Sequence, residues 1–244
     1  MEIFSPKLKK YQRKFDYSYA FGPYPTIDLL KHKRDSVLEV LLNSNNDGSE
    51  SVQEVVRLCK EFGIKIEEQD RAIEKIAFKE NTYTVGVFKK YECELEVGKN
   101  HLVLVEPRNM GNLGTIIRTM LAFGIKDLAI IKPAVDIFDP KVVSSTMGAI
   151  FQVNFKYYGS IEEYLKDFSN HHIYTFMLDG AKDIREVKFE EPFSMVQGSE
   201  SSGLPGDFKN LGQSVYIPQS KDIDSLNLSV ATAIGLWEGG RRKI

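Results

Sequence analysis

Apolar and polar positions alternate along the second half of the chain in the pattern of a layered α/β domain. Short apolar runs predict buried strands at residues 102–105, 128–131, 173–178, 194–197 and 215–217. Segments with helical spacing lie between or after them, at 115–123, at 164–168 and from Val230 to Trp237. Such alternation predicts a parallel sheet with helices on both faces.

The last predicted helix carries an apolar stripe at positions i, i+3, i+4 and i+7, made up of Val230, Ala233, Ile234 and Trp237. A stripe of this width faces either the core of the domain or another subunit. We expect it to face the core.

Smaller elements alternate in the first half. Residues 37–42 form a strand or a helix end, residues 52–59 have helical spacing that Gly63 ends, and residues 82–88 are rich in β-formers. Residues 1 to about 20 are predicted to be a polar arm with aromatic side chains. The charged segment 92–100 marks a boundary, which predicts two domains, 1–97 and 98–244.

The composition of the chain indicates where the protein acts and whether it needs disulfides or a metal. The chain is 42% apolar and 27% charged, and it has no run of about 18 apolar residues that could span a membrane. The amino terminus has no apolar segment typical of a secretory signal, so we expect a cytoplasmic protein. Cys59 and Cys93 are expected to be reduced, and the histidines lack metal-ligand spacing, so no metal is predicted.

The net charge of −2 argues against indiscriminate nucleic-acid binding but leaves room for local basic patches. Three clusters qualify: Lys7, Lys9, Lys10, Arg13 and Lys14; Lys31 to Arg34; and Arg241 to Lys243. The first two are either RNA contacts or a solvated tail and a solvated helix end. The third would also complement the dipole of the last helix.

Three loops combine glycine with polar side chains after predicted strands: 106–114, followed by Arg118; 198–205; and 217–231. Ligands of parallel sheets bind at such loops. Taken alone, the third loop favours an ordinary helix N-cap by Ser or Asn.

The chain lacks the key residue of each standard ligand-binding or catalytic motif that these loops resemble. Gly111 and Gly114 supply only part of a dinucleotide fingerprint, Leu204 stands where a Walker loop needs lysine, and Glu200 replaces the serine of a nucleophile elbow. The residues that remain suit the binding of a polar cofactor by backbone groups.

The three loops together resemble the motifs of the SpoU (TrmH-like) branch of the SPOUT superfamily of RNA methyltransferases. The three matching segments, in family order, are 109–119, 196–204 and 217–231. The first half is similar, more loosely, to the L30e-like substrate-binding domain of that family, with Val85–Phe88 at the matching strand.

This resemblance implies a trefoil-knotted α/β domain, S-adenosylmethionine as cofactor, methylation of a ribose 2′-hydroxyl of rRNA or tRNA, and a homodimer with active sites near its interface. The residues that match family positions with a catalytic role are Asn112, Arg118, Glu200, Ser225 and Asn227. Those that match positions holding the cofactor by their backbone are Gly198, Ile217 and Leu226. Since the pKa of arginine exceeds about 12, we favour Arg118 as a ligand of phosphate or of the 2′-oxygen over a general base.

The chain departs from the family pattern at two places. Residues 219–224 lack the usual Met and Gly, and Ser201-Ser202 replace the more usual Gly-Arg. Two alternatives stay open: a non-catalytic RNA-binding member of the same fold that acts in RNA assembly, and, more remotely, a small-molecule enzyme.

Overall fold

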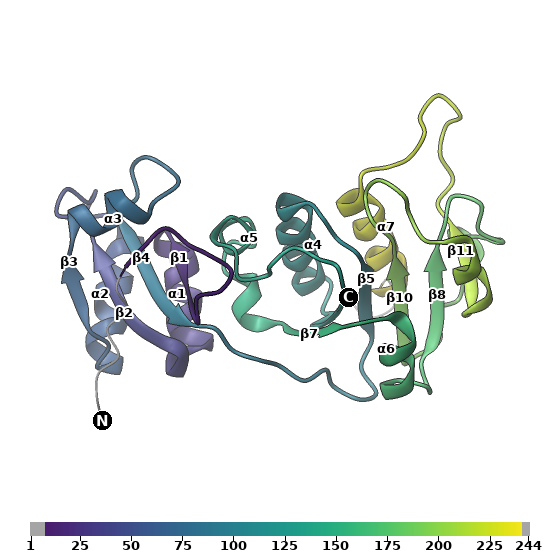
Figure 1. Ribbon diagram of the computed structural model, residues 1–244, viewed down its shortest axis with the longest axis horizontal. Coiled ribbons are helices and arrows are strands. Elements are labelled where there is room, and N and C mark those ends of the chain that lie inside the picture. The colour runs from purple at the N-terminus through teal and green to yellow at the C-terminus, as the bar shows by residue number, and fades with distance from the viewer. Residues whose placement is uncertain (1–7, 241–244) are drawn as a thin grey trace. The chain divides into compact units, whose positions relative to one another are not determined.

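The computed structural model describes residues 8–240; residues 1–7 and 241–244, which include Lys7 and the Arg241–Lys243 cluster, lie outside the described part. The chain divides into two compact units (Figure 1). The first unit comprises the described residues up to Tyr91 together with Asp136–Gln152, and the second comprises Glu92–Val135 and the residues from Val153 onward. Sequence patterns did not indicate that residues 136–152 belong with the first unit.

The first unit is built on a mixed sheet in the order β1-β4-β2-β3, in which β4 runs antiparallel to both of its neighbours. Its elements before residue 91 are β1 (Tyr17–Phe21), α1 (Pro23–His32), β2 (Val37–Leu42), α2 (Glu50–Phe62), β3 (Ile66–Glu68), α3 (Asp70–Ile76) and β4 (Thr84–Lys89). Gly63 ends α2 in a left-handed conformation (φ 67°), as its position predicts.

The expected polar arm is wrong for its last residues. Tyr17, Tyr19 and Phe21 form the buried strand β1, and their rings pack in one core cluster with α3 and the face of the sheet beneath it. Alternate tyrosines and phenylalanines suit a strand buried on this face. The basic residues nearby had made this segment resemble a solvated tail.

Residues 136–152 form α5 (Pro140–Ser145) and a 3-10 helix at Ala149–Gln152. Both are held in the first unit by apolar and polar contacts. The Phe88 ring packs on Phe138 and Phe151, with ring centroids 5.9 and 5.3 Å apart, and the Ser18 hydroxyl donates a 2.5 Å hydrogen bond to the Phe138 carbonyl.

The second unit is a parallel sheet in the order β7-β6-β5-β10-β8-β11-β9 (Figure 1). Its elements are β5 (His101–Val105), α4 (Met110–Ala122), β6 (Asp127–Ile131), β7 (Asn154–Tyr158), α6 (Ile161–Asp167), β8 (His172–Phe176), β9 (Lys182–Asp183), β10 (Phe193–Gln197), β11 (Gln213–Tyr216) and α7 (Leu228–Gly240). The α/β class with a parallel sheet is therefore confirmed; β7 and β9 were not predicted.

The strand order reverses next to β5. The chain passes from β5 to β6 and then β7 on one side, whereas β10 lies on the other side and is followed by β8 and β11. In such sheets the loops that leave neighbouring strands at the reversal point diverge and leave a crevice. The loops after β5 and β10 are two of the three loops that the sequence singled out.

The apolar stripe of α7 does not face the core as expected. Val230 and Trp237 are 47% and 48% exposed, and the buried positions of α7 are instead Leu228, Thr232, Gly235, Leu236 and Gly240. Among the described helices, none combines the length and the apolar character needed to cross a membrane.

Candidate active site

Asn109 and Asn112 shape the beginning of α4. The side chain of Asn109 caps the helix by accepting a 3.0 Å hydrogen bond from the Asn112 amide, which satisfies one of the free N–H groups of the first turn. The side chain of Asn112 is then free to bond to other loops.

The Glu200 carboxylate connects the loop after β10 to the loop after β5. It accepts hydrogen bonds from the Asn112 side-chain amide (3.1 Å) and from the backbone amides of Arg108 and Asn109 (both 3.2 Å). Burial by itself raises the pKa of Glu200, but these hydrogen bonds to the charged form outweigh it and hold the pKa below its usual range. Glu200 is therefore an anion at neutral pH.

Asn227 connects the third loop to Asn112 and thereby to Glu200. Its side-chain amide donates to the Asn112 side-chain oxygen at 3.2 Å. Its own side-chain oxygen accepts hydrogen bonds from the Ser229 amide (2.9 Å) and hydroxyl (2.7 Å) at the start of α7. Asn227 is thus both the ordinary helix cap expected from the loop alone and a member of the three-loop network Glu200–Asn112–Asn227.

A cavity of about 510 Å³ opens beside this network at the carboxyl ends of β8, β10 and β11. Its size lies in the range of small-molecule and cofactor sites. Segments 176–179, 197–204 and 224–226, together with Val215, Ile217, Gln219, Leu228 and Ala231, line it.

The charges of the lining residues select the kind of ligand. Three carboxylates line the cavity, Asp179, Glu200 and Asp224, and the described lining residues include no lysine, arginine or histidine. Such a wall disfavours a phosphate and suits a ligand with an apolar body and positive charge. Asp179 is also held by Lys209, at 2.5 Å.

Gly198 allows the wall of the cavity to close tightly. A Cβ atom at this position would lie 2.1 Å from the Gly203 carbonyl carbon, closer than any side chain can approach. Ser199 and Gly203 form a bridge across the same turn. Glycine is therefore required here so that the loop can fold back on itself and present its backbone to the cavity.

The predicted site residues divide into three groups. Gly198, Glu200, Ile217, Ser225 and Leu226 line the cavity. Asn112 and Asn227 join the hydrogen-bond network at its side. Arg118 lies on the exposed face of α4, and its side chain has no hydrogen-bond or ion-pair partner among residues 8–240. Such an arginine is available to an external anion.

The atypical segment 219–224 belongs to the site, because Gln219 and Asp224 at its two ends line the cavity. The Gln219 side chain reaches across the segment to donate a 3.4 Å hydrogen bond to the Asp224 carbonyl.

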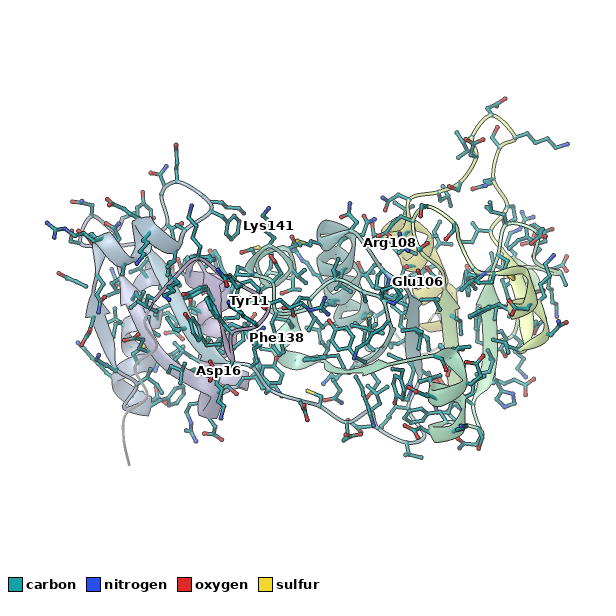
Figure 2. All side chains as sticks on the ribbon, viewed as in Figure 1. Tyr11, Asp16, Glu106, Arg108, Phe138 and Lys141 are labelled. Carbon is teal, nitrogen blue, oxygen red and sulfur yellow. The ribbon has the colours of Figure 1, made fainter. Side chains whose placement is uncertain are left out.

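Sequence reasoning missed two features of the site. The segment Phe176–Asp179 at the carboxyl end of β8 lines the cavity, and its only signal in the sequence was its place at the end of the strand predicted at 173–178. Glu106 adopts a left-handed backbone conformation (φ 52°) and pairs with Arg108 at 2.9 Å; Figure 2 labels both residues. Non-glycine residues in this conformation concentrate at functional sites, but no sequence pattern reports them.

No group of three or more potential metal ligands occurs within residues 8–240.

Comparison with known proteins identifies one relative that matches nearly the whole chain and another that matches part of it. A 23S rRNA (guanosine-2′-O-)-methyltransferase, RlmB, of Acinetobacter baylyi is 25% identical over 93% of this chain and 98% of its own length. A tRNA/rRNA methyltransferase of Synechocystis is 30% identical, but the match spans 58% of this chain and about half (53%) of that relative.

Solved structures show the same fold. The AdoMet-bound rRNA methyltransferase of Sinorhizobium meliloti superposes with a TM-score of 0.77 over 94% of this chain and 88% of its own, at 25% identity. The SpoU methyltransferase AviRb of Streptomyces viridochromogenes, in complex with AdoMet, gives 0.80 over 93% and 91%, at 21% identity. The family model described as the SpoU rRNA methylase family matches residues 99–237, the part of the chain that carries all three loops. The resemblance inferred from those loops is confirmed, and the chain belongs to the SpoU rRNA methylase family.

Proposed function

We propose that the protein transfers a methyl group from S-adenosylmethionine to a ribose 2′-hydroxyl of rRNA or tRNA. The observation that carries this proposal is the cavity next to the Glu200–Asn112–Asn227 network, which is lined by three carboxylates and, among the described lining residues, by no lysine, arginine or histidine. S-adenosylmethionine is a positively charged sulfonium with an apolar adenosyl body, and it fits a cavity of this size and charge. The relatives named above are RNA methyltransferases.

When bound, S-adenosylmethionine supplies an electrophilic methyl group on its sulfur. The chain positions the cofactor, and we assign its contacts to the backbone groups of Gly198, Ile217 and Leu226. These residues line the cavity together with Ser225. The fixed amides of Asn112 and Asn227 orient the attacking hydroxyl. Holding two reactants in line accounts for much of the rate of such a displacement.

We assign Arg118 to the binding of the RNA substrate. A guanidinium carries five N–H donors and no acceptor, so Arg118 donates hydrogen bonds to a phosphate or to the 2′-oxygen of RNA. Its exposure on α4 without a partner among the described residues supports this role.

The test combines calorimetry with a methyl-transfer assay on rRNA and tRNA transcripts. We expect Arg118→Ala to lower methyl transfer at least about 100-fold, the size of effect seen when a group that stabilises developing charge is removed, with an unchanged Kd for S-adenosylmethionine. Lys126→Ala, an exposed cation on the loop before β6, is the matched control and should retain full activity. Retained turnover in Arg118→Ala would refute the role of the arginine.

The same calorimetry separates the enzyme from a non-catalytic RNA-binding relative. That alternative predicts RNA binding without S-adenosylmethionine binding. If the wild-type protein shows no heat of binding with the cofactor, the methyl-transfer proposal is wrong.

We further propose that the protein is a homodimer, acts in the cytoplasm and contains the knot of its family. Support for the dimer comes from α7, which has a single charged residue, Glu238, and yet leaves Val230 and Trp237 half exposed. A helix that is apolar on all sides is usually buried, so a second copy of the chain would cover this face.

A further inference from the structure

The segment of residues 8–15 is amphipathic. Leu8, Tyr11 and Phe15 pack against the core cluster of the first unit. Between them, the charged side chains are exposed, and we call them the basic strip: Lys9, Lys10, Arg13 and Lys14. The strip is therefore a surface of the folded unit and not a loose tail.

The amino-terminal end of the strip is fixed by Tyr19 of β1. The buried Tyr19 hydroxyl donates a 2.6 Å hydrogen bond to the Lys9 carbonyl and accepts one of 3.2 Å from the Lys9 amide. A turn closed by the Phe15 amide and the Gln12 carbonyl (2.9 Å) follows.

Lys90 and Asp136 fix the other end. The ammonium group of Lys90 donates to the Arg13 carbonyl at 2.9 Å and pairs with the Asp136 carboxylate at 3.4 Å. The Tyr11 hydroxyl also donates to Asp136, and the Lys90 amide donates to the Asp16 carbonyl at 2.8 Å. Figure 2 labels Tyr11 and Asp16 at this junction.

The lysines of the strip carry uncompensated charge. Lys9, Lys10 and Lys14 make no ion pair with any residue in the range 8–240, and Asp16 is the only acid in positions 8–16. Some other cations of this unit are neutralised: Arg57 pairs with Glu54 and Glu61, and Lys65 with Glu39 and Glu67. The nearby Asp136 is already occupied by Lys90 and Tyr11.

We infer that the basic strip binds the phosphate backbone of the RNA substrate. Exposed lysines without counter-charges attract a polyanion, and phosphate contacts fix the position of a nucleic acid without reading its sequence. Because hydrogen bonds hold the backbone of the strip in place before binding, RNA does not have to order it, which lowers the entropic cost of association. This inference rests on the proposed function.

The experiment measures RNA affinity as a function of salt for the full chain. The variant K9Q/K10Q/K14Q removes three charges from the strip, and the control R57Q/K60Q/K65Q removes three exposed cations from the α2 side of the same unit. Each lost phosphate contact lowers the slope of log K against log salt by about 0.7 to 0.9, so we expect the strip variant to lose about 2 to 3 units of slope.

The probes are rRNA and tRNA transcripts, measured by filter binding together with methyl transfer. We expect the strip variant to bind RNA at least 10-fold more weakly near physiological salt, with an unchanged Kd for S-adenosylmethionine, while the control matches the wild type. If the wild type methylates RNA and the strip variant binds it with the affinity and slope of the control, the inference is overturned. If the wild type neither binds nor methylates RNA, the proposed function fails, and the inference fails with it.

Discussion

Glu200 is the residue on which the geometry of the site depends most. Its carboxylate receives donors from Asn112, Arg108 and Asn109, and through Asn112 it is connected to Asn227. A hydrogen bond to a charged acceptor is roughly twice as strong as one to a neutral acceptor. Glu200 therefore holds the first and second loops in the positions that the cofactor cavity requires.

The low pKa of Glu200 predicts how this contribution varies with pH. Glu200→Gln keeps one acceptor but turns an NH₂ group toward backbone N–H donors, so we expect the free energy of unfolding at pH 7 to fall by about 1–3 kcal/mol. A carboxyl whose pKa is lowered by folding stabilises the protein above its unfolded pKa and loses that contribution as pH falls through the folded pKa. The difference between wild type and variant should thus shrink in acid.

Urea denaturation at a series of pH values between 7 and the acid limit of solubility measures this difference. Glu92→Gln is the control, because Glu92 is exposed and has no hydrogen-bond or ion-pair partner within the described chain. A constant difference between Glu200→Gln and wild type at all pH values would show that the charge of Glu200 contributes nothing.

At the scale of the single residue, the sequence singled out polar side chains that meet in one hydrogen-bond network, but it did not indicate which of them contact one another. Asn112, Glu200 and Asn227 are 27 to 115 positions apart, and only the strand order brings them together. The reversed connection next to β5 cannot be read from local periodicity, which reports elements and not their order in a sheet.

At the scale of the element, α7 is the helix on which the proposed homodimer depends. Trp237 packs edge-on against Phe123 at the end of α4, with ring centroids 5.9 Å apart, and still exposes about half of its surface. We expect Val230→Asp to convert a dimer into a monomer, because a buried unpaired carboxylate at an interface costs several kcal/mol.

Sedimentation equilibrium checks this expectation. Val97→Asp changes an even more exposed valine (75%) in the segment before β5 and should leave the oligomeric state unchanged. A wild-type chain that sediments as a monomer at micromolar concentration would contradict the proposed homodimer.

Two elements, α7 and β1, were predicted poorly, each because the local pattern did not separate a buried face from an exposed one. α7 carries small and apolar residues on every side, so its periodicity could not tell the core face from the exposed face. β1 follows the basic strip directly, and its strand pattern was read as part of a solvated arm. Where apolar runs were short and bounded by glycine or charge, as in β5, β6 and β10, the predicted strands agree with the structure within one residue.

At the scale of the whole molecule, the two units are not separate in sequence. Residues 136–152 leave the second unit after β6, fold into the first unit and return to begin β7. Their apolar side chains are buried there: Ile137, Phe138, Val142, Val143, Ile150 and Phe151. Gly148 adds a close contact, since a Cβ atom at this position would lie 2.1 Å from a carboxylate oxygen of Asp28.

This exchange of chain predicts the behaviour of a catalytic fragment. Removing residues 1–97 leaves 98–244 with the apolar side chains of residues 136–152 uncovered, and each large one contributes about 1.5–3 kcal/mol when buried. We expect this fragment to aggregate, and we expect a version in which a Gly/Ser linker of equal length replaces 136–152 to stay monodisperse in light scattering. The linker version should still bind S-adenosylmethionine in calorimetry, because every residue that lines the cavity belongs to the second unit. Equal solubility of the two fragments would mean that residues 136–152 do not depend on the first unit for their burial.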